Sequence, residues 1–274
     1  MYLFAAGGGK FKGKDYGTWC AEQEVHKLYS INGEGQQVLN YNHPHLKLVA
    51  DSGGHIFNKG SDGINPLGHE RESDPPDPKK YLEEVFIPWV YKFKDISCTI
   101  FELDIYGHLP IDTIDGVFRE LSSIKGKFQF VRCFHPLGID GDYSLRTLKK
   151  WVSEGQDYIA ISNSSDTCYH DIFKITTPNN VRLHGLALTG TSVLSKYPFF
   201  SADSSNALVT PFKSGTVVLD SGKNISIGAA LDERSLNYIL YRDFESRLVQ
   251  SIKMFKEAEG FYTRLWESRG IIWK

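Results

Sequence analysis

Hydrophobic residues in this chain gather into short runs that are separated by polar or amphipathic stretches. The runs show little alternation of apolar and polar positions, which is typical of strands that are covered on both faces. They lie at Tyr2 to Ala6, Leu46 to Ala50, Thr99 to Leu103, Phe128 to Phe134, Tyr158 to Ile161, Arg182 to Leu188, Phe199 to Ala202 and Thr216 to Leu219. The pattern therefore predicts about eight mostly buried strands.

Helical patterns lie between these runs. Apolar residues recur at helical spacing over Lys80 to Lys94, Thr113 to Ile124 and Ser144 to Ser153. Such alternation favours an α/β protein with a parallel sheet. We expect a single domain over residues 1–274, a closed (β/α)₈ TIM-like barrel with a C-terminal helical extension over about 232–274 packed on it. An open doubly wound sheet is the alternative, which is weakened because no GxGxxG follows the early strands.

Length and composition restrict the class of protein. The chain has 274 residues, 41% of them hydrophobic, which is enough for one large core. No stretch approaches the roughly 18 apolar residues of a membrane span, and no basic region precedes the short apolar start, so a secretory signal is not expected. The four cysteines are widely spaced and form no CxxC. We therefore expect reduced cysteines and a cytoplasmic protein without membrane contact.

Two acidic residues directly follow predicted strands that are far apart in the chain. Asp51 follows Leu46 to Ala50 and precedes Ser-Gly-Gly, and Asp203 follows Phe199 to Ala202. In a barrel of parallel strands, side chains at the carboxyl ends converge on one face. Two carboxylates brought together there can divide the work of nucleophile and proton carrier. They are the leading candidates for catalytic residues.

Other strand ends carry chemical groups as well. Asp104 ends a third predicted strand, His135 ends a fourth, and His184 with Gly185 lies in a strand that enters a glycine-bearing turn. Taken singly, each could merely satisfy loop amides. Their recurrence at the same end of successive strands favours a shared site. The stretch Asn58 to Pro78, rich in Gly, Asp, Pro and Glu, is predicted to be a long loop on this face, either a lid or a disordered segment.

The order of these motifs resembles that of the tRNA-guanine transglycosylases. The resemblance spans about residues 46–220. It rests on DSGG at 51–54, on Asp104, and on the block from Leu183 to Asp203, which contains HGLALTG and ends in FFSAD. The likeness is closer to their compact relatives in phages and microbes, which act on tRNA or DNA with 7-deazaguanine bases.

The resemblance implies a base exchange at an N-glycosidic bond. Asp203 would attack C1′ of the sugar, expel guanine and form a covalent glycosyl-enzyme, and Asp51 would take the proton from the incoming base. Asp104 would accept hydrogen bonds from the Watson–Crick edge of the base. The resemblance further implies substrate-binding roles for Ser52, Gly53, Gly54, His135, Ile161, Ser162, His184 and Gly185. No cofactor is expected, and the target base would leave its stack.

The chain departs from the family in ways that affect its partners. The zinc-binding CxCxxC is absent, so no metal is expected. Ser204 to Leu208 stands in place of an Arg-bearing segment that grips the anticodon loop, which leaves DNA and tRNA both open as substrates. The expected partners are thus nucleic acid and a 7-deazaguanine base, with a partner subunit or a homodimer left open.

Two other functions fit the residues. One is a nucleoside or nucleic-acid N-glycosidase, in which water replaces the incoming base, and the other is a non-catalytic nucleic-acid-binding barrel. The net charge of −2 gives no overall support for binding to phosphates. A local basic patch, such as Lys10, Lys12 and Lys14, would be sufficient.

Overall fold

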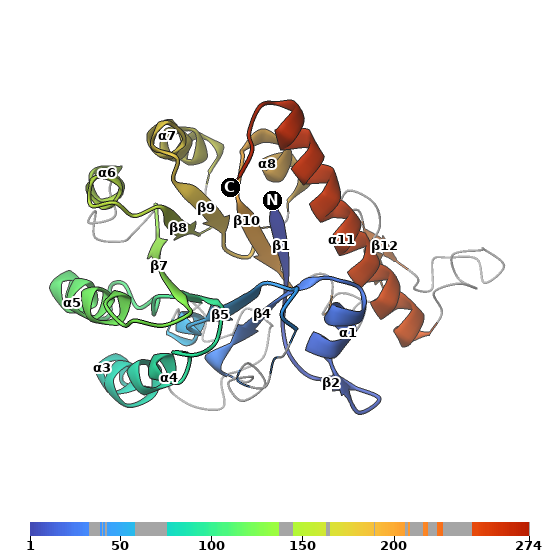
Figure 1. Ribbon diagram of the computed structural model, residues 1–274, viewed down its shortest axis with the longest axis horizontal. Helices are drawn as coiled ribbons and strands as arrows, with labels where there is room; N and C mark the ends of the chain where they lie inside the picture. The colour runs from blue at the N-terminus through green and yellow to red at the C-terminus, as the bar shows by residue number, and fades with distance from the viewer. Residues whose placement is uncertain are drawn as a thin grey trace.

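Eight parallel strands close into a barrel in the computed structural model, which describes residues 1–32, 39, 41, 43–57, 76–136, 145–162, 165–188, 190–205, 208, 216–218, 224–226 and 243–273. Each strand pairs with the next one along the chain, and the last pairs with the first (Figure 1). The strands are β1 (Tyr2–Ala6), β4 (His26–Ser30), β5 (Leu48–Asp51), β6 (Thr99–Phe101), β7 (Gln129–Phe134), β8 (Tyr158–Ile161), β9 (Arg182–Gly185) and β10 (Ser201–Ser204). The predicted TIM-like barrel is confirmed.

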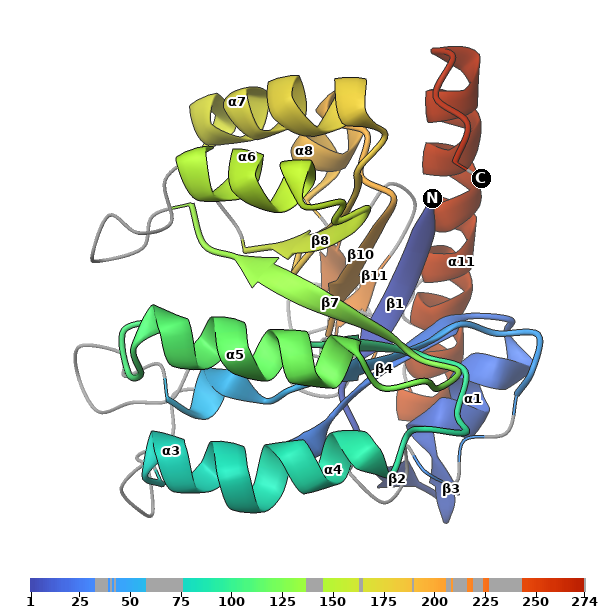
Figure 2. The ribbon, with the colours of Figure 1, turned by 60° about the vertical axis from the view of Figure 1, so that its left-hand side comes forward.

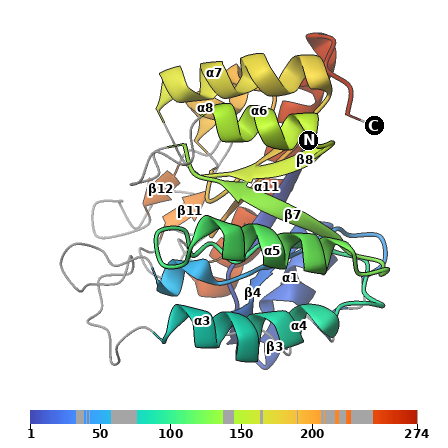
Figure 3. The same cartoon turned by 90° about the vertical axis from the view of Figure 1, so that its left-hand side faces the viewer.

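Helices cover the outside of the strands (Figures 2 and 3). In chain order they are α1 (Tyr16–Glu22), a continuous stretch of α3 (Pro78–Tyr81), the π-helical η2 (Leu82–Phe86) and α4 (Ile87–Tyr91), then α5 (Ile111–Ser122), α6 (Leu145–Ser153), α7 (Asp166–Thr176) with η3 (Thr177–Asn179), α8 (Thr191–Lys196) and α11 (Phe244–Ser268). A short hairpin of β2 (Lys10–Phe11) and β3 (Lys14–Asp15) precedes α1. The three helices predicted between strands are confirmed as α3 to α4, α5 and α6.

One barrel strand, β4, was not predicted from the hydrophobic pattern. The strand β4 begins with His26 and Lys27, yet Lys27 is fully buried. Its Nζ donates hydrogen bonds to the carbonyl oxygens of Gly7 and Leu28, each at 2.5 Å, which satisfies the ammonium inside the protein. The prediction that Thr216 to Leu219 belongs to the barrel was wrong. The described part of this run forms β11 (Thr216–Val218), which pairs antiparallel with β12 (Asn224–Ser226) in a separate sheet, and Leu219 lies outside the described residues.

Parts of two predictions lie outside the described residues. They are residues 58–75 of the predicted loop and residues 232–242 of the predicted C-terminal extension. Among the described residues, α11 begins at Phe244, where Asp243 caps it by accepting from the backbone N–H of Ser246 at 2.9 Å.

The side chains of each strand alternate between the barrel interior and the surrounding helices. On β9 and β10, Leu183 and Ala202 belong to the core beneath the helices. Their neighbours His184 and Ser201 face inward as register partners. Asp203 lies two residues beyond Ser201 and therefore faces the same interior, at the carboxyl end of its strand. Asp51 does the same on β5, two residues beyond the interior residue Val49.

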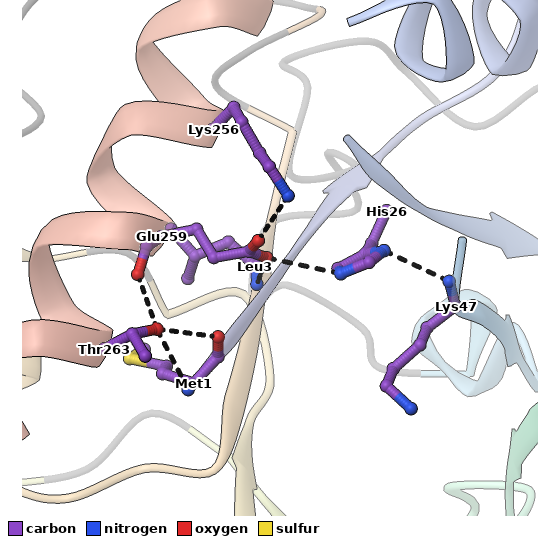
Figure 4. Close-up of polar contacts among 7 residues, drawn as sticks. All are labelled: Met1, Leu3, His26, Lys47, Lys256, Glu259 and Thr263. Carbon is purple, nitrogen blue, oxygen red and sulfur yellow. Dashed lines mark hydrogen bonds and ion pairs between the residues drawn. The ribbon is translucent and has the colours of Figure 1, made fainter. Parts of the chain in front are cut away.

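The last helix fixes the opposite, amino-terminal end of the barrel through one buried carboxylate (Figure 4). Glu259 on α11 accepts a hydrogen bond from the backbone N–H of Leu3 at 2.8 Å and another from Lys256 at 2.8 Å. It also lies 3.5 Å from Nε2 of His26, whose Nδ1 accepts from the backbone N–H of Lys47 at 3.1 Å. The helix is thus tied to β1 and β4, and the expected packing of a C-terminal helix on the barrel is confirmed.

Within the described ranges, no helix combines the length and the apolar character that crossing a membrane requires. All four cysteines are free, and Cys20, Cys98 and Cys133 are buried.

Candidate active site at the carboxyl ends of the strands

Asp51 ends β5, and a tight turn brings the chain back over its carboxylate. Its Oδ2 accepts a hydrogen bond from the backbone N–H of Gly53 at 3.2 Å. Gly53 has a φ of 73°, in the left-handed region that favours glycine. The side chain of Asn32 donates to the carbonyl oxygen of Gly53 at 2.7 Å and accepts from the hydroxyl of Tyr81 at 2.6 Å. The turn after Asp51 is therefore held from two sides.

The next glycine makes a close contact with the neighbouring strand end. A Cβ atom on Gly54 would lie 2.5 Å from the carbonyl oxygen of Asp104 and 2.7 Å from its Cβ. Only a residue without a side chain fits there. The Ser-Gly-Gly sequence after Asp51 thus lets the DSGG turn lie directly against Asp104, and it places two predicted site residues in contact.

Asp203 is buried and firmly held by one of its two carboxylate oxygens. Its Oδ1 lies 3.0 Å from Nε2 of His184 and accepts the backbone N–H of Ala187 at 2.9 Å. Ala187 has a φ of 51°, an uncommon conformation for alanine that turns its N–H toward the carboxylate. Both of these contacts are made by Oδ1, so within the described residues His184 and Ala187 fix one oxygen of the carboxylate.

The charges of the strand-end carboxylates act on one another. The pKa of Asp51 is raised to about 7, first by burial, then by the negative charge of Asp203, and also by that of Asp104. Hydrogen bonds from the backbone N–H of Gly53 and from Ser30 oppose the rise. Like charges raise a carboxyl pKa strongly only over short distances. Asp51 and Asp203 lie at the carboxyl ends of β5 and β10, and Asp104 follows β6, so the parallel barrel brings all three to one mouth.

His135 lies beside Asp104 at the same mouth. Its Nε2 is 2.9 Å from Oδ1 of Asp104, although the angle is poor for a hydrogen bond. The imidazole also lies near Tyr106, with ring centroids 5.6 Å apart. The carboxylate of Asp104 and the partly accessible imidazole of His135 thus lie together. A polar ligand could bind to both groups in place of their contact with each other.

The remaining predicted residues are placed less uniformly. Ser52 is buried directly after Asp51. Ile161 belongs to the core between the barrel and the helices, so its side chain points away from the interior, and only its backbone lies near the strand end. Ser162 donates its backbone N–H to the carbonyl oxygen of Phe134 at 3.2 Å.

Two predicted residues lie on β9. Gly185 leaves room for Leu188, since a Cβ there would lie 2.7 Å from that side chain. His184 is fully buried, and both of its ring nitrogens are engaged by protein groups.

One buried carboxyl group near the site was missed by the sequence analysis. Glu102 accepts at Oε1 from the hydroxyl of Tyr106 and from the backbone N–H of Cys133 at 2.9 Å. Burial raises its pKa to about 8, against the opposing charge of Arg132, and the charge of Asp104 adds to the rise. The available signal was its position inside an otherwise apolar strand, two residues before Asp104.

Among the residues that the structure describes, no group of three or more His, Cys, Asp or Glu side chains is arranged to hold a metal ion. The chemistry that the site offers comes from its carboxyl groups and imidazoles. A pair of carboxyls, one held in place by two hydrogen bonds and one whose pKa is raised to about 7, suits nucleophilic displacement with proton transfer.

No family model matches this chain, and no curated protein matches it.

Proposed function

We propose that this protein is a base-exchange transglycosylase that replaces guanine in DNA or tRNA with a 7-deazaguanine derivative. The observation that carries the proposal is the position of Asp51 and Asp203 at the carboxyl ends of β5 and β10, at one mouth of the barrel, where burial and the charge of Asp203 raise the pKa of Asp51 to about 7. Paired carboxylates of unequal proton affinity are the machinery of glycosyl transfer with retained configuration.

Asp203 is the nucleophile in this proposal. Its Oδ2 attacks C1′ of the sugar while the bond from C1′ to the guanine nitrogen breaks, and the electron pair leaves with the base. The two contacts of Oδ1, with His184 and with the backbone N–H of Ala187, fix the plane of the carboxylate. The product of this step is an ester between Asp203 and the sugar.

Asp51 carries the proton. It gives a proton to the departing guanine and later takes one from the incoming base, whose nitrogen then attacks C1′ and releases Asp203. Formation of the ester removes the negative charge that raises the pKa of Asp51. The pKa therefore falls after the proton has been given away, and it rises again when Asp203 is released. The same residue thus suits both directions of transfer.

Asp104 supports recognition of a guanine-like base. Its carboxylate can accept from the ring N–H and amino group of such a base, and His135 beside it offers a ring nitrogen. The close approach of Gly54 to Asp104 supports this role, because it brings Asp104 next to the turn that follows Asp51. A base bound there must be flipped out of a duplex or belong to a single strand.

The test is an exchange assay with labelled guanine and labelled 7-deazaguanine on tRNA and on single- and double-stranded DNA. We expect incorporation into one of these nucleic acids, lost by at least ~1,000-fold in Asp203→Asn, because the nucleophile is removed. Asp171→Asn, an exposed change on α7, is the matched control and should be unaffected. Release of free base without incorporation would indicate the hydrolytic alternative, and binding with neither reaction would indicate a non-catalytic barrel.

A further inference from the structure

A chain of four buried polar groups crosses the barrel interior and ends on Asp203. Nε2 of His184 lies 3.0 Å from Oδ1 of Asp203, and Nδ1 of His184 lies 2.7 Å from the hydroxyl of Ser201. The hydroxyl of Ser201 lies in turn 2.6 Å from that of Tyr158. His184 and Ser201 are both fully buried. Three neighbouring strands, β8, β9 and β10, therefore supply one continuous hydrogen-bonded relay.

The imidazole of His184 is fixed by its surroundings as well as by these bonds. Its ring centroid lies 4.6 Å from that of Phe101 and 6.0 Å from that of Phe4, both interior residues. A buried ring with apolar neighbours and a partner at each nitrogen has one orientation available. The side chain cannot swing toward a substrate without breaking two hydrogen bonds.

The direction of each hydrogen bond follows from the chemistry of its two ends. An ionised Asp203 can only accept, so Nε2 of a neutral His184 must carry the hydrogen and Nδ1 must accept. Ser201 then donates to Nδ1, and its own oxygen accepts from Tyr158. Burial raises the pKa of Tyr158, which keeps the phenol protonated and able to donate. Every donor in the relay thus points toward Asp203.

We propose that His184, in its Nε2–H tautomer, is a positioning residue that holds the carboxylate of Asp203 in its orientation, and that the relay from Ser201 and Tyr158 fixes this tautomer. This assignment rests on the proposed function of Asp203 as nucleophile, and it gives His184 a role through that carboxylate instead of direct contact with the base. Oδ1 is engaged by His184 and Ala187, and Oδ2 is the oxygen that attacks C1′ in this proposal.

The far end of the relay reaches a second opening of the barrel. Tyr158 is one of the residues around a cavity of about 520 Å³ at the amino-terminal ends of the strands, together with Lys47, Gln129 and Arg182. The relay therefore spans the interior from this opening to the mouth that holds Asp203. A change at Tyr158 can alter the relay while leaving the two direct donors to Asp203 in place.

Nitrogen NMR of ¹⁵N-histidine-labelled protein tests the assignment without any substrate. We expect the resonances of His184, identified by their loss in His184→Phe, to show a protonated Nε2 and an unprotonated Nδ1. One contrary result is a protonated Nδ1 with an unprotonated Nε2, which would require Asp203 to donate the hydrogen bond. The other is protonation of both ring nitrogens, which would make His184 an imidazolium and exclude the neutral relay. Either result would overturn the proposal, whatever reaction the protein catalyses.

Kinetics on the substrate found by the exchange assay test the functional part. We expect His184→Phe to lower kcat on the order of 100-fold with little change in KM, since a misplaced reacting group costs about that factor. The acidic limb of the pH profile should move to higher pH, because the variant lacks the hydrogen bond that His184 donates to the carboxylate. His184→Gln, which can restore one donor, should recover part of both effects, and Tyr158→Phe should give a smaller loss.

Val131→Ala, another change in the barrel interior, is the control for general loosening and should leave the pH profile in place. An unshifted pH profile in His184→Phe, or full turnover in that variant, would remove the positioning role while leaving the exchange reaction intact. Full exchange by Asp203→Asn would instead remove the proposed function itself.

Discussion

Asp51 illustrates how one residue acquires a function from its surroundings. A carboxyl group of this type ordinarily has a pKa of 3.8, and here burial and two neighbouring carboxylates raise it to about 7. The rule that strand ends converge was sufficient to predict that Asp51 and Asp203 are candidates. It could not predict the sizes of the burial and charge effects, which depend on the packing of turns that the sequence pattern does not specify.

The coupling between the two carboxylates gives a direct prediction. In Asp203→Asn, the negative charge that raises the pKa of Asp51 is absent, so this pKa should fall below about 7, while burial should keep it above 3.8. Carbon NMR of ¹³C-aspartate-labelled protein, titrated from pH 3 to 9, measures it. An unchanged pKa of Asp51 would mean that the two groups do not interact.

The raised pKa of Asp51 should also lower the stability of the folded protein. Because its pKa is raised on folding, the folded state binds more protons than the unfolded state between pH 3.8 and about 7, so stability falls as pH rises through that interval. The full shift corresponds to about 4 kcal/mol, and partial solvent contact reduces it. We expect the free energy of unfolding of Asp51→Asn, measured with urea, to exceed that of the wild type by about 1–2 kcal/mol at pH 8. At pH 4 the two free energies should be almost equal. An equal gain at both values would exclude this cause.

Other residues could have been found by closer attention to strand alternation. Ser201 and Asp203 are two apart on one strand, and His184 pairs with Ser201. Glu102 interrupts an apolar strand just before Asp104. The partner of each group was not readable from the sequence, because cross-strand neighbours depend on register. The sequence also placed Ile161 in the pocket, whereas its side chain packs beneath the helices.

At the scale of elements, hydrophobic runs located seven of the eight barrel strands. The strand β4 was missed because a run that opens with His26 and Lys27 has the composition of a surface segment. Its polar groups are instead satisfied by backbone carbonyls and by Glu259. Thr216 to Leu219 had the composition of a barrel strand, and only tertiary structure separates it from the barrel. Local composition thus identifies strands better than it assigns them to a sheet.

The turn after β5 offers a test of how closely two elements must approach. Gly54→Ala would place a Cβ 2.5 Å from the carbonyl oxygen of Asp104, so the backbone must shift. We expect a loss of about 1–3 kcal/mol in unfolding free energy and a fall in exchange activity. Gly116→Ala on α5, with open space around the new Cβ, is the control and should stabilise by roughly 1 kcal/mol. Equal effects of the two changes would contradict the close contact.

At the scale of the whole molecule, the two ends of the barrel carry different groups of residues. The amino-terminal end is tied by Glu259 to the last helix (Figure 4). The carboxyl end collects Asp51, Asp104, His135 and Asp203. The basic residues Lys12 and Lys14 near this end are each paired with a glutamate, Glu245 and Glu22 respectively. Two lysines of the suggested basic patch are therefore already paired within the protein, and we expect a nucleic acid bound at this end to be recognised mainly through its flipped base.

The most direct test of the central claim is to trap the covalent intermediate. The protein is mixed with guanine-containing tRNA or single-stranded DNA, quenched in acid, digested and analysed by mass spectrometry. The account predicts a sugar–phosphate chain that lacks one guanine, attached to the peptide containing Asp203 and absent in Asp203→Asn. An adduct on any other residue, or exchange that continues in Asp203→Asn, would contradict it.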